Sequence, residues 1–244
     1  MAPKLLPFMG HLEEFRKRVL VSLVALSAGA AFSFFYIDEI IDMLTKPLRP
    51  QVGQIYFFSP ADAFTIKIKA ALLAGFLVAS PLVLCELWLF LSPAMHPKER
   101  KALIPVVFIT SFLFLTGALF SFFTVLPAAL HFLIGQQTPY LRPLVSMNEY
   151  LSFISGMMIA FGFAFNLPVL VTALVATGFV TVKTLSHYHR HIVVLIFIAA
   201  AVLTPGPDIA SQMMLAIPLL VLFEVSLLAG WIVQKTKKGK ARAL

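Results

Sequence analysis

Charged residues and cysteine are both scarce in this sequence. Only 12% of the 244 residues are charged, whereas 60% are hydrophobic; a soluble domain carries about 25% charged residues. The single cysteine, Cys85, lies in an apolar run, which excludes an internal disulfide framework and a CxxC metal or redox site. The composition therefore predicts an all-α polytopic membrane protein.

Motifs for several chemistries are missing as well. The sequence contains no GxxxxGK[ST] loop, no serine elbow and no HExxH pair, so nucleotide hydrolysis and protease chemistry have no support. Its 19 Lys and Arg exceed its 11 Asp and Glu, but no basic and aromatic platform for single-stranded nucleic acid lies outside the apolar runs. We therefore predict a protein that is not an enzyme, that has no cofactor or metal, and that binds no nucleic acid.

Six apolar segments alternate with more polar connections. The first has 19 residues without a charge, roughly 28 Å as a helix, which is enough to cross the hydrocarbon core. The fifth has only 12 residues, about 18 Å, which is too short. We therefore predict that the last two helices form a hairpin, at least one of them short, with its turn at residues 204–208. The predicted transmembrane helices are 19–37, 70–91, 102–126, 151–176, 192–203 and 209–232.

The distribution of basic residues predicts the orientation. Fourteen of the 19 Lys and Arg, in groups of four, three, two and five, fall in segments 1–18, 92–101, 177–191 and 233–244. The other five fall in loops 38–69 and 127–150, and none falls in the turn 204–208. Because basic loops stay inside, we predict cytoplasmic termini and an external loop 38–69 with short helices. No small-residue cleavage site follows the first apolar run, so we expect that helix to be retained.

The first cytoplasmic segment ends in the octet HLEEFRKR, residues 11–18. Helical spacing places Glu13 one turn from Lys17 and Glu14 one turn from Arg18. One interpretation is a solvated, self-paired start of a helix. The other is that Glu14 accepts a cationic ligand at the membrane surface, and spacing alone does not decide between them.

The second cytoplasmic segment reads FLSPAMHPKERK. Taken alone, its one acid, Glu99, would pair with Arg100 or Lys101. Together with the octet, however, it resembles TatC, the multispanning subunit of the twin-arginine protein translocase, whose segments read His-Leu-x-Glu-Leu-Arg-x-Arg and Phe-x-x-Pro-Ala-Leu-x-x-x-Glu-Arg. The resemblance continues through SPADAF, ALIPVVF, AFGFAFNLPV and LTPGPDIASQMMLAIPLLVLFEVS, with Phe15 and Met95 replacing the usual leucines.

The resemblance implies recognition of signal peptides that carry paired arginines on folded cargo proteins. Glu14 and Glu99 match the family's recognition site, with Phe90 nearby. A carboxylate accepts both arms of a forked guanidinium, which the point charge of lysine does not offer. The apolar part of the signal peptide would lie along the membrane-facing surface, and the basic neighbours of the two acids would meet anionic lipid headgroups. The supporting motif residues are His11, Arg16, Pro93 and Arg100.

The resemblance also implies an assembly and an energy source. The expected partners are single-span Tat subunits of the TatA and TatB type, further copies of the chain in a receptor complex, and membrane lipid. Transport would depend on the proton motive force, in the cell inner membrane. The implied fold has six transmembrane helices in a concave, glove-like bundle, with short helices five and six.

Several polar residues fall within the predicted spans, where they are costly and often functional. We expect Glu86 to be mostly structural, and Glu224 to face a polar cluster or another helix. Asn166 stands where similar family members carry Glu or Gln, which puts a protonation role in doubt but keeps a hydrogen bond to a partner subunit; Gln212 is a further candidate contact. Asp208 matches the acid of the external turn or acts as a helix cap. Bends or breaks are expected at Pro81, Pro127, Pro168 and Pro218.

The run His187-Tyr-His-Arg-His191 raises the possibility of a metal site. His187 and His191 would share a face if the helix were continuous, but no nearby carboxylate or cysteine in the sequence completes a ligand set. Two alternatives to a translocase subunit remain open. One is a solute or metal-ion transporter that uses Glu86, Glu224 and the histidines. The other is an assembly scaffold that binds no cargo.

Overall fold

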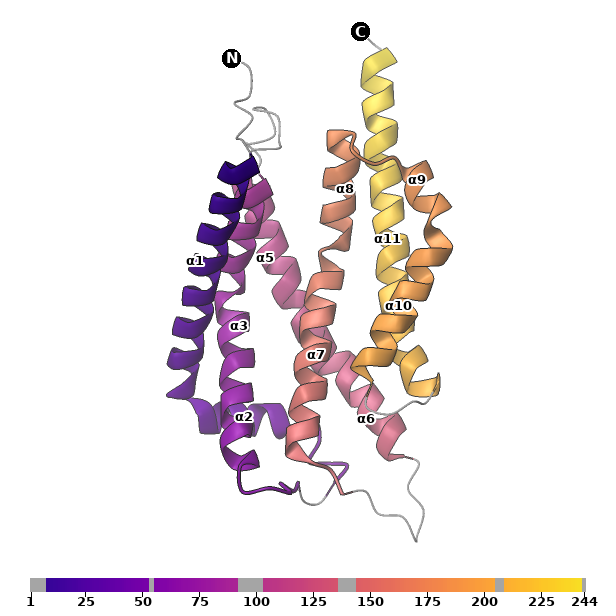
Figure 1. Ribbon diagram of the computed structural model, residues 1–244. Coiled ribbons are helices and arrows are strands. Elements are labelled where there is room, and N and C mark those ends of the chain that lie inside the picture. The colour runs from indigo at the N-terminus through magenta and orange to yellow at the C-terminus, as the bar shows by residue number, and fades with distance from the viewer. Residues whose placement is uncertain (1–7, 53–54, 92–102, 136–143, 205–208, 243–244) are drawn as a thin grey trace. The chain divides into compact units, whose positions relative to one another are not determined.

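The computed structural model describes residues 8–52, 55–91, 103–135, 144–204 and 209–242. Within these ranges every regular element is a helix, and the one bridge, between Tyr56 and Ser146, is isolated (Figure 1). The all-α fold class is confirmed. The elements are α1 (Phe8–Phe34), α2 (Ile37–Thr45), α3 (Asp62–Leu91), α5 (Leu103–Phe120), the π-helical turn η2 (Ser121–Val125), α6 (Leu126–Ile134), α7 (Met147–Phe165), α8 (Leu167–Thr177), α9 (Val182–His187), α10 (His189–Leu203) and α11 (Ile209–Arg242).

Five stretches of helix are long and apolar enough to cross a membrane, and α10, with 15 residues, is a shorter apolar helix. The first stretch has the least protein around it: 6% of its apolar window is buried, against 28–39% for the other four. Side chains such as Val24, which is 68% exposed, are therefore left for contact with lipid. The five stretches are Leu12–Phe34, Asp62–Phe90, Ile104–Ile134, Met147–Ala176 and Gln212–Thr236.

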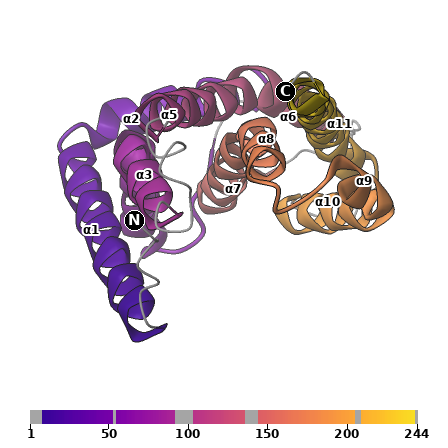
Figure 2. The same ribbon diagram turned by 90° about the horizontal axis from the view of Figure 1, so that it is seen from above.

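One compact unit comprises residues 1–45 and 59–115. In it α1 and α3 lie side by side, and α2 packs against α3 (Figures 1 and 2). The two long helices approach most closely at Gly29 and Gly75: a Cβ atom on Gly29 would lie 2.7 Å from the carbonyl oxygen of Gly75. The absence of side chains at these two positions lets the backbones meet, and this contact fixes the register of α1 against α3.

The other compact unit comprises residues 46–58 and 116–244. α11 packs against α8 and forms a hairpin with α10, while α7 supplies much of the buried apolar surface. This unit contains all of the polar residues that were predicted to lie in the last three spans. The fully buried side chains of α7 are Leu151, Ile154, Met157 and Phe161.

Several helices extend beyond the predicted transmembrane boundaries. α1 begins at Phe8 and α3 at Asp62, because polar residues continue each helix beyond its apolar run. The third apolar helix continues through η2 and α6 to Ile134, inside the predicted external loop 127–150. α11 has 34 residues and ends at Arg242. The expectation of a short sixth helix is therefore wrong: its basic tail is rich in helix-favouring Lys and Arg, which also suit a helix C-terminus.

At two of the four prolines the regular α-helical hydrogen-bonding pattern changes. Asn166 separates α7 from α8, and Pro168 lies in the first turn of α8, where its missing N–H costs no hydrogen bond. Pro127 occupies the equivalent place in α6, directly after η2. Pro81 and Pro218 lie inside α3 and α11, which continue through them.

The glycine contact predicts a large effect for a small substitution. Gly29→Val places side-chain atoms against the backbone of Gly75, and overpacking of this kind costs about 1–3 kcal/mol. We expect a lower free energy of unfolding, measured by circular dichroism in detergent. Ala28→Val, at an exposed position one residue away, is the control and should be nearly neutral; equal losses in the two variants would contradict the proposed contact.

Candidate functional site

Side chains of α1 and α3 form an ion cluster. The guanidinium of Arg18 donates to Oε1 of Glu14, from Nη2 at 2.7 Å and from Nε at 3.2 Å. Its Nη1 donates to Oε2 of Glu86 at 2.8 Å. The side chains of Glu14, Arg18 and Glu86 are 22%, 22% and 19% exposed, so water screens their charges only in part. We call these three residues the Glu–Arg–Glu cluster.

The register of α1 and α3 explains this cluster. Arg18 precedes Gly29 by 11 residues and Glu86 follows Gly75 by 11 residues, which is roughly three helical turns in each helix. Because the antiparallel helices meet at the two glycines, equal spacing places Glu86 opposite Arg18. Glu14 joins them because it lies one turn from Arg18 on the same face.

Two recesses open beside the cluster. One has a volume of about 590 Å³, and its lining includes Glu14, Lys17 and Glu86. The other has a volume of about 540 Å³; its lining consists of charged side chains of α1 at one end and of Leu20, Val21 and Val24 at the other. Along α1, the carboxylate of Glu14 is thus followed by the apolar surface of the second recess.

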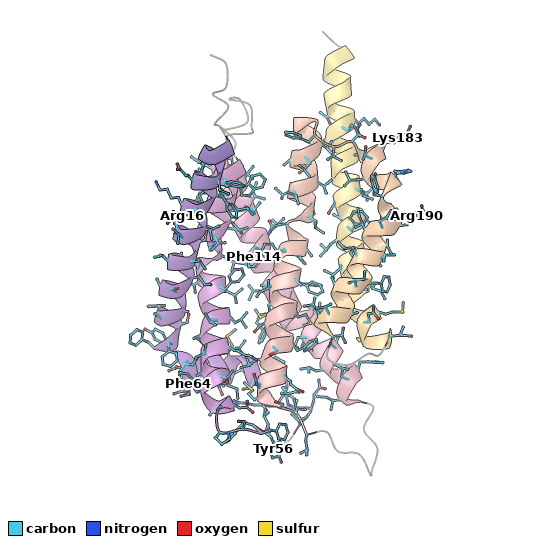
Figure 3. The ribbon with its side chains drawn as sticks, in the orientation of Figure 1. Arg16, Tyr56, Phe64, Phe114, Lys183 and Arg190 are labelled. Carbon is cyan, nitrogen blue, oxygen red and sulfur yellow. The ribbon has the colours of Figure 1, made fainter. Side chains whose placement is uncertain are left out.

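The other predicted residues of this region fall into two groups. No ion pair joins Glu13 to Lys17 in the described part of α1, so only one of the two pairs expected from helical spacing forms. Arg16 is exposed on α1 (Figure 3), and the ring of Phe90 contacts that of Phe15 with centroids 5.5 Å apart. The backbone of His11 belongs to α1, but its side chain lies outside the described residues, as do Pro93, Glu99 and Arg100.

Two polar contacts join α10 to α11. Nε2 of His189 lies 2.6 Å from Oε1 of Glu224, and these side chains are 40% and 55% exposed. Nε2 of Gln212 donates to the carbonyl oxygen of Phe197 at 2.8 Å. Of the two arrangements expected for Glu224, the structure shows contact with another helix rather than an inward-facing cluster.

Asn166 leaves a buried acceptor unused. Its Nδ2 donates to the carbonyl oxygen of Gly162 at 3.1 Å, which holds the side chain at the junction of α7 and α8. Its Oδ1 is buried and accepts no hydrogen bond from the described residues. Asp208 lies outside the described residues.

The histidine run does not form one continuous helical face. α9 ends at His187 and α10 begins at His189, and the ring of Tyr188 contacts the rings of both His187 and His191 at centroid distances of 5.3 and 5.8 Å. No carboxylate lies near these histidines in the sequence, but in the fold the carboxylate of Glu224 lies beside His189. Across the described ranges, no group of three His, Cys, Asp or Glu side chains is arranged to hold a metal ion.

Comparison with known proteins decides the family. The model of the TatC family, described as Sec-independent protein translocase protein, matches residues 10–218. The chain belongs to the TatC family. A TatC from Desulforapulum autotrophicum is 35% identical over 234 residues, which cover 95% of this chain and 86% of the relative. A TatC from Aquifex aeolicus is 34% identical over 243 residues, which cover 98% of this chain and all of the relative.

Solved structures agree with this assignment. A crystal structure of the twin arginine translocase receptor TatC matches with a TM-score of 0.84 and 33% identity, over 91% of this chain and 99% of that chain. A structure of TatC in DDM gives a TM-score of 0.83 and 35% identity, over 90% and 99%. This TatC-family chain is therefore a multipass membrane subunit of the Sec-independent, or Tat, protein translocase, and not an enzyme.

Sequence reasoning missed two contacts of this TatC-family chain. Arg18 and Glu86 are 68 positions apart, and only their equal distance from two glycines could have paired them. His189 and Glu224 are 35 positions apart, and their pairing depends on how α10 packs against α11. The sequence pattern marks the residues of each pair individually, but it does not show that they meet.

The pairing of His189 with Glu224 predicts non-additive stability effects. We expect His189→Ala and Glu224→Ala each to lower the free energy of unfolding, with a coupling of about 0.6 kcal/mol, typical of polar contacts between membrane helices. The double variant in detergent measures this coupling. Arg190, the next residue of α10 (Figure 3), provides the control: Arg190→Ala combined with Glu224→Ala should be additive. Additivity in the histidine pair would refute the contact.

Proposed function

We propose that this TatC-family chain is the receptor subunit of the twin-arginine translocase, which binds twin-arginine signal peptides of folded cargo at the cytoplasmic face. The observation that carries the proposal is the carboxylate of Glu14, which accepts two N–H groups from one guanidinium. A signal-peptide arginine offers the same donors. The name of the structural relative, a twin arginine translocase receptor, supports the same role.

Two carboxylates can each accept the guanidinium of one arginine of the pair. We assign the second arginine to Glu99 and place Phe90 beside the site, where its ring already packs against Phe15. His11, Arg16, Pro93 and Arg100 belong to the same two cytoplasmic sequence motifs as the two acids. Lysine presents a compact ammonium in place of a planar fork, so replacing arginine by lysine in the ligand removes matched hydrogen bonds while keeping the charge.

The apolar part of the signal peptide fits the recess along α1. Leu20, Val21 and Val24 line it below the charged residues, and α1 is the apolar helix with the least protein around it. A peptide with arginines followed by an apolar stretch has the same order of charge and hydrophobicity. Arg16 and Lys17 lie where anionic lipid headgroups would meet them.

The translocase role also includes partners and an energy source. We assign contacts with single-span Tat subunits of the TatA and TatB type to Gln212, Glu224 and Asn166, whose buried Oδ1 has acceptor capacity to spare, and we place Asp208 at the external turn. Further copies of the chain would complete the receptor complex. Transport would draw on the proton motive force across the cell inner membrane.

The proposed orientation has both termini in the cytoplasm. In a Cys85→Ser background, Ala2→Cys and Leu244→Cys should resist a membrane-impermeant maleimide in intact spheroplasts and react after permeabilisation. Ser59→Cys, in the proposed external loop 38–69, should react in both conditions and serves as the control. Labelling of either terminus in intact spheroplasts would overturn the orientation.

Signal-peptide binding is tested with the purified chain in lipid nanodiscs. We expect a labelled Arg-Arg peptide to bind, and Glu14→Gln to weaken binding about 10- to 100-fold, because a charge-assisted hydrogen bond contributes about 1.5–3 kcal/mol. Glu99→Gln should act in the same direction, and a Lys-Lys peptide should bind the wild type poorly.

Glu13→Gln is the matched control, since it removes an equal charge from the neighbouring, exposed residue. Its effect should be small. Equal binding of both peptides to all variants would remove Glu14 and Glu99 as the recognition pair and would favour an assembly scaffold.

A further inference from the structure

The acceptor proposed for the signal peptide is already occupied by an arginine of the same chain. Arg18 places Nη2 and Nε on Glu14 and Nη1 on Glu86. We propose that Arg18 is an internal competitor for Glu14, and that Glu86 is the positioning residue that retains Arg18 when a signal-peptide arginine takes its place. This inference rests on the proposed role of Glu14.

The hydrogen bonds of Arg18 are arranged for such an exchange. The bonds to Glu14 and to Glu86 use different nitrogens of the guanidinium, so those to Glu14 can break while the 2.8 Å bond to Glu86 remains. Arg18 engages only Oε1 of Glu14, whereas a side-on fork engages both oxygens of a carboxylate. An incoming arginine that uses both oxygens therefore offers Glu14 a geometry that Arg18 does not provide.

Charge balance explains why a second acid is needed. Two carboxylates and one guanidinium leave the Glu–Arg–Glu cluster with one net negative charge, and an incoming arginine neutralises it. Without the carboxylate of Glu86, the same event would leave two guanidinium groups with one acceptor. At a site where the three side chains are only 19–22% exposed, an unpaired charge is costly.

The recess beside the cluster provides a route for the ligand. It has a volume of about 590 Å³ and is lined by Glu14, Arg18 and Glu86 together. Glu13 and Lys17, the other charged residues of its lining, form no ion pair with each other in the described structure. A ligand side chain can therefore approach both partners of the bond that it is proposed to replace.

Competition of this kind has a defined thermodynamic consequence. The apparent affinity of a ligand falls by the fraction of molecules in which its acceptor is available. The same factor applies to every ligand that needs Glu14. Arg18 therefore sets the strength of binding, while the choice of arginine over lysine depends on how each ligand contacts the acids.

The first arm of the test removes the competitor. With a labelled Arg-Arg peptide and the chain in nanodiscs, we expect Arg18→Gln to bind about three- to tenfold more tightly than Lys17→Gln, an effect that lies at the lower end of couplings between neighbouring groups. The two variants lose the same charge from the same recess, so their difference isolates the competition. Arg18→Lys, which keeps the charge but cannot span both acids with a fork, should also bind more tightly than the wild type.

The second arm tests Glu86 through a double-mutant cycle. Glu86→Gln should weaken binding about three- to tenfold, more than the charge-matched Glu13→Gln. In the Arg18→Gln background, the effect of Glu86→Gln should shrink to that of Glu13→Gln, because no internal arginine remains to be retained. A residue that contacts the ligand directly would keep its full effect in that background.

The outcomes separate this inference from the proposed function. If Arg-Arg binding depends on Glu14 but Arg18→Gln binds no better than Lys17→Gln, the competition is refuted and the receptor role stands. If Glu86→Gln keeps its effect without Arg18, Glu86 is a direct acceptor and the positioning role is refuted. Binding that is indifferent to Glu14→Gln refutes the proposed function itself. Thermal unfolding of each variant establishes that it is folded, and Arg18→Lys replaces Arg18→Gln if the latter is not.

Discussion

The close contact of α1 and α3 at Gly29 and Gly75 is the constraint on which the charged end of this unit depends. In other registers a side chain would stand between the two backbones, so the glycine contact determines which residues face one another several turns away. Arg18 and Glu86 are equally distant from it and therefore meet. The proposed ligand site thus takes its geometry from glycines within the apolar part of the two helices.

Several charged side chains of the described residues lie where two helices touch. Arg18 joins α1 to α3, and His189 with Glu224 joins α10 to α11. In a membrane the hydrophobic effect does not drive helices together, so polar contacts and close packing carry more of the association. The same polar groups are the ones that a ligand or a partner helix can reach. If these groups also bind the proposed ligands, stability and recognition compete for the same hydrogen bonds.

The apolar runs predicted the helices well because membrane spanning requires length and hydrophobicity, both of which are local properties. The pairing of Glu14 with Arg18 was also predictable, since it depends on one helical turn. The pairing with Glu86 depends on the register of two helices, which no local pattern encodes. The extra length of α11 was missed for a related reason: its basic tail lacks the hydrophobicity that marked the other helices, although its residues favour helix.

Of the two helices in this hairpin, α10 is shorter than the hydrocarbon core of a bilayer and α11 is not. α10 has 15 residues, about 22 Å, against a hydrocarbon core of about 30 Å. The apolar stretch of α11 has 25 residues and is long enough to span that core on its own. Since Gln212 and Glu224 bond to Phe197 and His189 at two levels of the hairpin, α10 is held on α11 by side chains rather than by its own fit to lipid. Because a helix shorter than the hydrocarbon core is matched by local thinning of the bilayer rather than by tilting, α10 is the helix of this hairpin that would favour such thinning.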